Sequence, residues 1–86
     1  MTMIQEVSVI GMGKLGASML AGMASRGFNV IGVDIAESAV RAVNEGRAPV
    51  QETDLEEMIS AHRDMVRATT SHEEAVAERF DTALVA

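Results

Sequence analysis

The stretch from Glu6 to Asp34 constrains the fold of this chain more than any other part of the sequence. It begins with 7–10, a run rich in β-branched residues that fits a strand covered on both faces, as in parallel sheets. A G-x-G-x-x-G pattern follows and opens a proline-free segment of good helix formers. A second apolar run, 28–33, then leads to Asp34. The order strand, glycine turn, helix, strand, acid predicts a βαβ unit.

The three glycines and the acid of this unit indicate a site for a dinucleotide. Gly11 allows the tight turn, Gly13 lets the backbone approach a pyrophosphate, and Gly16 permits close packing of helix on strand. The free N–H groups and the dipole at the helix start favour phosphate. Asp34 follows Gly16 by 18 positions (34 − 16), close to the roughly 20 expected for the acid that binds the adenosine ribose. The alternatives are a βα turn without a ligand and, for Asp34, a plain helix cap or turn residue.

The residues around Asp34 favour NAD over NADP. An aspartate at this place can accept hydrogen bonds from both ribose hydroxyls, and it repels a 2′-phosphate. No arginine stands in 35–38, and we expect Arg41, farther along, on a solvated helix face.

The glycine pattern is not an ATPase-type phosphate loop. Gly13-Lys14 is followed by Leu15 rather than Ser or Thr, so no hydroxyl is placed for magnesium. The sequence contains no Cys, and neither His has a partner at metal-ligand spacing, so we predict no metal site. The carboxylates are expected on solvated helix surfaces, and no catalytic residue is predicted.

Length and composition narrow the class of protein. The 86 residues allow one small domain, 1–86, with an aliphatic core, since only two residues are aromatic. The net charge of −6 argues against a nucleic-acid partner. No apolar run is long enough to span a membrane and no signal-peptide pattern opens the chain, so we expect a cytoplasmic protein.

The rest of the chain continues the alternation of helices and strands. The first two expected helices cover about 14–26 and 37–45. A third is expected to start at a capping box in Thr53-Asp-Leu-Glu56, and a fourth to run from a capping box at Ser71 to about Glu78. Expected strands cover 65–69 and 80–86. We expect the apolar side chains of the helices to face inward; these are Leu15, Met19, Leu20, Met23, Ala36, Val40, Val43, Leu55, Met58 and Ile59.

These elements predict a truncated Rossmann-type, doubly wound parallel sheet of the α/β class, with strand order 3-2-1-4 and helices on both faces. Because the sequence stops within a strand, we expect a fragment, with the domain incomplete at its C-terminus. The fourth strand would then be an open apolar edge, which favours pairing with a second copy and hence a homo-oligomer.

Two further segments are distinctive: the loop Asn44-Glu-Gly-Arg-Ala-Pro49 and the strand end Arg67-Ala-Thr-Thr70. Together with the glycine loop they resemble the amino-terminal NAD-binding region of the UDP-glucose/GDP-mannose dehydrogenase family. The glycine loop alone would fit many dehydrogenases, whereas these two segments are more specific. The resemblance covers nearly the whole chain and also includes Val30-Ile-Gly-Val-Asp34 and Asp54-Leu-Glu-Glu57.

The resemblance implies an oxidoreductase that uses NAD to oxidise the C6 hydroxyl of a nucleotide sugar to a carboxylate. The implied cofactor-binding residues are Gly11, Met12, Gly13, Lys14, Leu15, Gly16 and Asp34. Many members have Tyr at the position of Lys14 and Lys at that of Ala39. The family's nucleophilic Cys and sugar-nucleotide pocket would lie beyond Ala86, so the nucleotide sugar would bind through the missing part.

Two other functions fit the same residues. One is another NAD(P)-dependent dehydrogenase, of the 6-phosphogluconate or 3-hydroxyisobutyrate type, from which Asp34 and the 44–49 loop distinguish this sequence. The other is a stand-alone nucleotide-binding regulatory or interaction module without catalysis.

Overall fold

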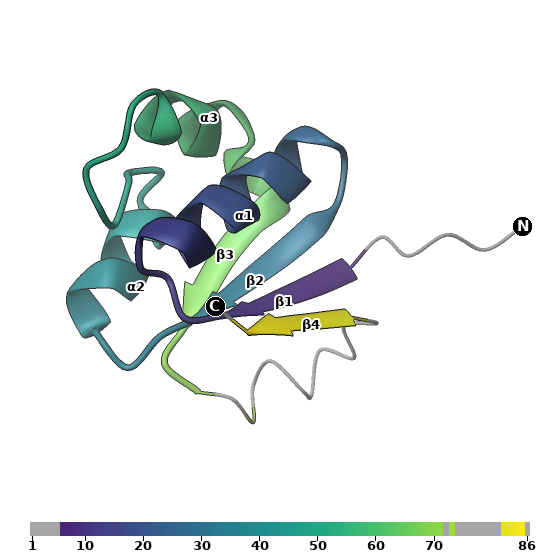
Figure 1. Ribbon diagram of the computed structural model, residues 1–86, viewed down its shortest axis with the longest axis vertical. Coiled ribbons are helices and arrows are strands. Elements are labelled where there is room, and N and C mark those ends of the chain that lie inside the picture. Colours follow the sequence, from purple (N-terminus) through teal and green to yellow (C-terminus); the bar gives the residue numbers. More distant parts are fainter. Residues whose placement is uncertain (1–5, 72, 74–81, 86) are drawn as a thin grey trace, which may run out of the picture.

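The computed structural model describes residues 6–71, 73 and 82–85. The helices and strands follow one another in the order β1 (Glu6–Ile10), α1 (Lys14–Ser25), β2 (Asn29–Val33), α2 (Glu37–Asn44), α3 (Leu55–Ala61), the 3-10 helix η1 (Arg63–Met65), β3 (Val66–Thr69) and β4 (Thr82–Val85). Figure 1 shows the strands side by side, with α1 lying across them. This arrangement confirms the α/β, Rossmann-like class.

The strands form one parallel sheet in the order β3-β2-β1-β4. In the central pair, Glu6 lies opposite Asn29 and Ile10 opposite Val33, so β1 and β2 end level with each other. Val33 in turn lies opposite Thr69 at the end of β3. Because all the strands of a parallel sheet end on the same side of the sheet, the segments that follow these strands meet there.

The main core lies between one face of the sheet and the helices. Side chains alternate along each strand, so Val7 and Val9 of β1 and Val30 of β2 point to this face. They pack with the buried residues Met12, Ala17, Leu20, Ala21, Ala24, Val43, Leu55, Ile59 and Val66. On the other face, Ile31 and Val33 form a smaller buried group with Ile10. The described α-helices contribute their buried side chains to the core on the first face. The prediction that helices cover both faces concerns residues outside the described part of the chain.

Helix α1 has the predicted bounds to within a residue, but it buries a different face. Its buried residues are Gly16, Ala17, Leu20, Ala21 and Ala24. The prediction that Leu15 points inward was wrong, because 65% of this residue is exposed. Glycine and alanine on the docked face let the helix pack closely on the strands. With 3.6 residues per turn, Leu15 lies nearly opposite the middle of this buried stripe and therefore faces solvent.

Gly32, inside β2, marks a close approach of neighbouring side chains. A Cβ added there would lie 2.8 Å from Leu20 Cδ1 and 3.1 Å from Met12 Cγ, and it would also collide with Met12 Sδ. The glycine therefore makes room for the buried side chain of Met12, whose residue belongs to the glycine turn.

The starts of α2 and α3 differ from the predictions. Ala36 is the exposed N-cap of α2 and does not point inward. The predicted capping box at α3 was wrong: the N-cap is Asp54, with φ 62° and no side-chain cap. Glu56, the expected partner in the box, instead accepts a hydrogen bond from the Ala48 amide at 3.1 Å. The carboxylate therefore holds the preceding loop and not the helix start.

Two predicted elements lie partly or mainly outside the described residues. The helix from Ser71 to about Glu78 lies almost wholly there, and the last strand is described only as Thr82–Val85. Within the described part, no helix is long and apolar enough to cross a membrane.

Candidate functional site

The glycine turn joins the carboxyl end of β1 to the start of α1. Gly11 has φ 95°, a left-handed conformation that favours glycine, and its amide donates to the Val33 carbonyl at 2.7 Å. This hydrogen bond extends the pairing of β1 and β2 by one residue and ties the turn to the end of β2. The expected role of Gly11 in a tight turn therefore agrees with its backbone geometry.

The N-terminus of α1 is open and carries no negative side chain of its own. Gly13 is the N-cap, no side chain caps the helix, and its first turn contains no acidic residue. By contrast, the first turns of α2 and α3 both contain glutamate. The first helical bond runs from the Ala17 amide to the Gly13 carbonyl at 2.8 Å, so the preceding amides, of Lys14 to Gly16, remain available to a ligand. A Cβ on Gly13 would meet nothing within 4 Å, so the approach to them is open.

Asp34 links the glycine turn to the start of α2. Its Oδ2 accepts a hydrogen bond from the Met12 amide at 2.7 Å, and its Oδ1 accepts one from the Ala36 amide at 2.9 Å. Its own amide donates to the Thr69 carbonyl at 3.2 Å. The carboxylate is thus fixed beside the glycine turn, at the edge of the sheet where the strands end.

These hydrogen bonds keep Asp34 ionised. The Ala36 amide, followed by the Met12 amide, lowers the pKa of the Asp34 carboxyl below its ordinary value of 3.8, and partial burial opposes this only in part. A carboxylate oxygen can accept two hydrogen bonds, and each oxygen here receives one from these amides. The Ile35 amide also lowers this pKa, and a carboxylate, which offers about four acceptor positions in all, can still accept from a diol.

Met12 lies at the site in a way that its sequence position did not reveal. The residue is only 1% exposed and its side chain packs in the core, while its amide donates a hydrogen bond to the Asp34 carboxylate. Met12 therefore positions the acid, whereas Gly13, Lys14, Leu15 and Gly16 present the helix start.

Two exposed apolar residues flank the site. Among the described residues, the large hydrophobic side chains that are exposed are those of Leu15, in the first turn of α1, and Ile35, which is 87% exposed and follows Asp34 directly. Ile35 was not among the site residues predicted from the sequence. Its place in the sequence could have indicated a role at the site, because it is an aliphatic residue directly after the acid and no core position was predicted there.

A second residue that the sequence analysis missed is Glu52, in the loop between α2 and α3. Its Oε2 lies 3.5 Å from the Lys14 Nζ, at the start of α1. The two residues are 38 positions apart (52 − 14), so no local pattern links them.

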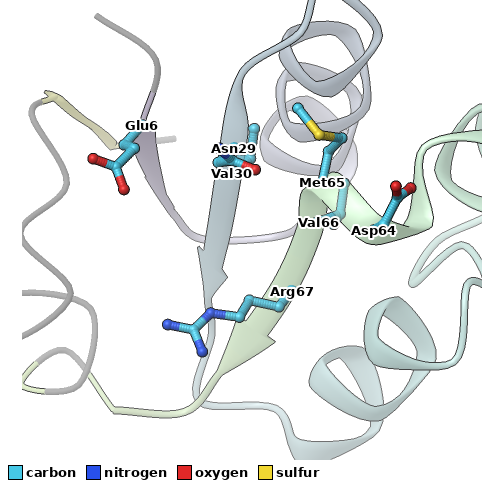
Figure 2. Close-up of a pocket in the computed structure, with 7 residues that line it drawn as sticks. All are labelled: Glu6, Asn29, Val30, Asp64, Met65, Val66 and Arg67. Atoms are coloured by element: carbon cyan, nitrogen blue, oxygen red, sulfur yellow. The ribbon is translucent and has the colours of Figure 1, made fainter.

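A separate hollow lies at the opposite edge of the sheet. Figure 2 shows Glu6 at the start of β1, Asn29 and Val30 at the start of β2, and Asp64 just before β3. Ligands of open α/β sheets bind at the carboxyl ends of the strands, so this hollow is not the dinucleotide site.

The glycine turn, the open helix start and the ionised Asp34 fit a dinucleotide: amides for a pyrophosphate and a carboxylate for a ribose diol. Fold and site together define a dinucleotide-binding domain of Rossmann type.

Comparison with known proteins identifies the family. Residues 5–86 match the UDP-glucose/GDP-mannose dehydrogenase family, NAD binding domain, and this chain belongs to that family. NAD is therefore its cofactor, and the resemblance seen in the sequence is confirmed.

Two curated relatives and two solved structures illustrate the similarity. The UDP-glucose 6-dehydrogenase AglM of Haloferax volcanii is 40% identical over 70 residues, which are 80% of this chain and 16% of that protein. The NDP-N-acetyl-D-galactosaminuronic acid dehydrogenase of Ralstonia nicotianae is 41% identical over 73 residues, 83% of this chain and 17% of that protein.

Among structures, a ternary complex of GDP-mannose dehydrogenase from Pseudomonas aeruginosa has a TM-score of 0.88 at 29% identity, covering 93% of this chain and 19% of that one. A UDP-glucose dehydrogenase from Pyrobaculum islandicum has a TM-score of 0.87 at 31% identity, covering 98% and 20%. The chain thus spans at most 20% of the length of these four relatives.

Proposed function

We propose that residues 1–86 are the NAD-binding domain of a nucleotide-sugar 6-dehydrogenase, which oxidises a sugar C6 hydroxyl to a carboxylate. The observation that carries the proposal is the Asp34 carboxylate, held by the Met12 and Ala36 amides beside the open start of α1. The family match and the relatives, which are named as sugar dehydrogenases, support the reaction. The nucleotide sugar would be bound by a further part of the protein.

The glycine turn and α1 hold the pyrophosphate in this proposal. The amides at the helix start, of Lys14, Leu15 and Gly16, donate to its oxygens, and the helix dipole adds favourable electrostatics. Gly11 and Gly13 keep the backbone close to the ligand.

Asp34 binds the adenosine ribose by accepting hydrogen bonds on its carboxylate oxygens. Because the carboxylate stays charged, it favours the free diol of NAD and repels the 2′-phosphate of NADP. Ile35, which follows it and is exposed, offers an apolar surface to the adenosine end. Bound NAD⁺ supplies the hydride acceptor, while the residues of this chain bind and orient it.

Calorimetric titration tests this function. We expect NAD⁺ to bind at least about tenfold more tightly than NADP⁺, since like charges in contact cost several kcal/mol. Asp34→Asn should weaken NAD⁺ binding by about 1–3 kcal/mol, because charge-assisted hydrogen bonds are lost. Asp64→Asn, on exposed η1 at the other edge of the sheet, is the matched control and should bind like wild type. Equal affinities for wild type and Asp34→Asn would remove Asp34 from the site.

Self-association and a cytoplasmic location stay predictions. In the described sheet β4 is an edge strand, paired with β1 on one side, and such an edge can pair with a second copy. A monodisperse monomer in dilute solution scattering would contradict the predicted homo-oligomer.

A further inference from the structure

We propose that Glu52 competes with the cofactor's pyrophosphate for the Lys14 ammonium and thereby sets the affinity of the site. This inference rests on the proposed NAD site and assigns a function to a residue outside it. Its starting point is the ion pair between Lys14 Nζ and Glu52 Oε2, at 3.5 Å, which joins the start of α1 to the loop between α2 and α3.

Lys14 is the one basic residue in the described segment that forms β1, the glycine turn and α1. It is the only lysine in the chain, and no other basic residue occurs in 6–25, the segment of β1, the glycine turn and α1. It is the first residue of α1, and side chains of a helix lean toward its N-terminus. The ammonium therefore lies on the same end of the helix as the free amides that would hold the phosphates.

The Lys14 side chain is free to change partner. Its exposed fraction is 78%, against 34% for the Glu52 side chain, so a ligand can reach it without opening the core. An exposed ion pair of this kind is weak, so a doubly charged pyrophosphate can outweigh it. The lysine can therefore be transferred from one anion to the other.

Glu52 opposes the ligand in two ways. It neutralises the ammonium, and its own charge repels the incoming phosphates. In a partly solvated site, a nearby charge of this kind changes the affinity for a charged ligand by about threefold to tenfold, and added salt reduces the effect. Glu52→Gln should therefore tighten binding by about this factor and Lys14→Met should weaken it by a similar one.

Titrations with NAD⁺, ADP, adenosine and inorganic pyrophosphate at low and high salt test the proposal on the full chain. Glu52→Gln should tighten the three phosphate-bearing ligands and leave adenosine unchanged, and the gain should shrink at high salt. The gain should also fall in a Lys14→Met background, and Lys14→Arg should bind nearly as wild type. Glu57→Gln makes the same change of net charge at an exposed residue of α3 that forms no ion pair with another described residue, and it should have little effect.

The outcomes separate this proposal from the NAD function. If Asp34→Asn weakens NAD⁺ binding while Glu52→Gln leaves it unchanged or weakens it, the competition is refuted and the NAD site stands. If no variant binds NAD⁺ but pyrophosphate shows the expected pattern, the competition stands and the NAD function fails. If neither ligand binds, both are refuted.

Discussion

The side-chain amide of Asn44 makes a pair of hydrogen bonds with the main chain of Ala68. Asn44 Nδ2 donates to the Ala68 carbonyl at 3.0 Å, and the Ala68 amide donates to Asn44 Oδ1 at 2.8 Å. Since β3 is at the edge of the described sheet, this amide takes the place of a neighbouring strand. It also fixes the strand next to Thr69, whose carbonyl receives the Asp34 amide.

Replacing Asn44 by alanine should therefore destabilise the fold. Each lost hydrogen bond costs about 1 kcal/mol, so we expect a decrease of about 1–2 kcal/mol in the free energy of unfolding, measured by urea titration. Asn44→Asp keeps an acceptor for the Ala68 amide but turns a carboxylate oxygen toward the Ala68 carbonyl, so this variant should also lose stability. An unchanged midpoint in the alanine variant would show that water replaces the amide without cost.

Gly32→Ala should destabilise the chain through overcrowding. The new Cβ would lie 2.8 Å from Leu20 Cδ1 and collide with the end of the Met12 side chain, and overpacking of this kind typically costs about 1–3 kcal/mol. The double variant Gly32→Ala, Met12→Ala removes the main collision, so its loss should be less than the sum of the two single losses. Gly22→Ala, where an added Cβ meets nothing within 4 Å, is the control. If the loss in the double variant equals the sum of the two single losses, the Met12 side chain is not the source of the overcrowding.

The pKa of Asp34 predicts how stability depends on pH. Its carboxyl has a lower pKa in the folded chain than its ordinary value of 3.8, so between the two values the unfolded chain binds more protons. Stability from this group is fully present above pH 3.8 and is lost as the pH falls through the folded pKa. Urea unfolding from pH 6 downward should show a shallower decline in Asp34→Asn than in wild type. Parallel curves would contradict the assignment.

Ile35→Ser should affect binding and not folding. The side chain is 87% exposed, so its removal should leave the unfolding midpoint unchanged within about 0.5 kcal/mol. If adenosine packs against it, affinity for NAD⁺ should fall about threefold to tenfold, since burying a few methylene groups contributes about 0.8 kcal/mol each. Binding of inorganic pyrophosphate should not change. Equal NAD⁺ affinities in titration calorimetry would exclude Ile35 from the site.

Local patterns were sufficient for the unit that defines the fold. The apolar run of β1, the glycine turn, α1 and the acid after β2 lie within 29 consecutive residues, 6–34, and their spacing predicted the βαβ unit. The positive φ of Gly11 and the place of Asp34 at the end of β2 agree with it. These features depend on the conformational preferences of single residues and on the spacing of near neighbours along the chain, and both can be read from the sequence.

The sequence by itself therefore determined the fold class and the cofactor, and it predicted a set of cofactor-binding residues around the glycine turn. Tertiary structure decided what surrounds them: Leu15 turns outward because a face of small residues docks α1, and Met12 fills the space that Gly32 leaves free. It also brought Glu52 to Lys14 across 38 positions (52 − 14). Such contacts depend on how whole helices, strands and loops pack against one another, and the spacing of residues along the chain does not predict that packing.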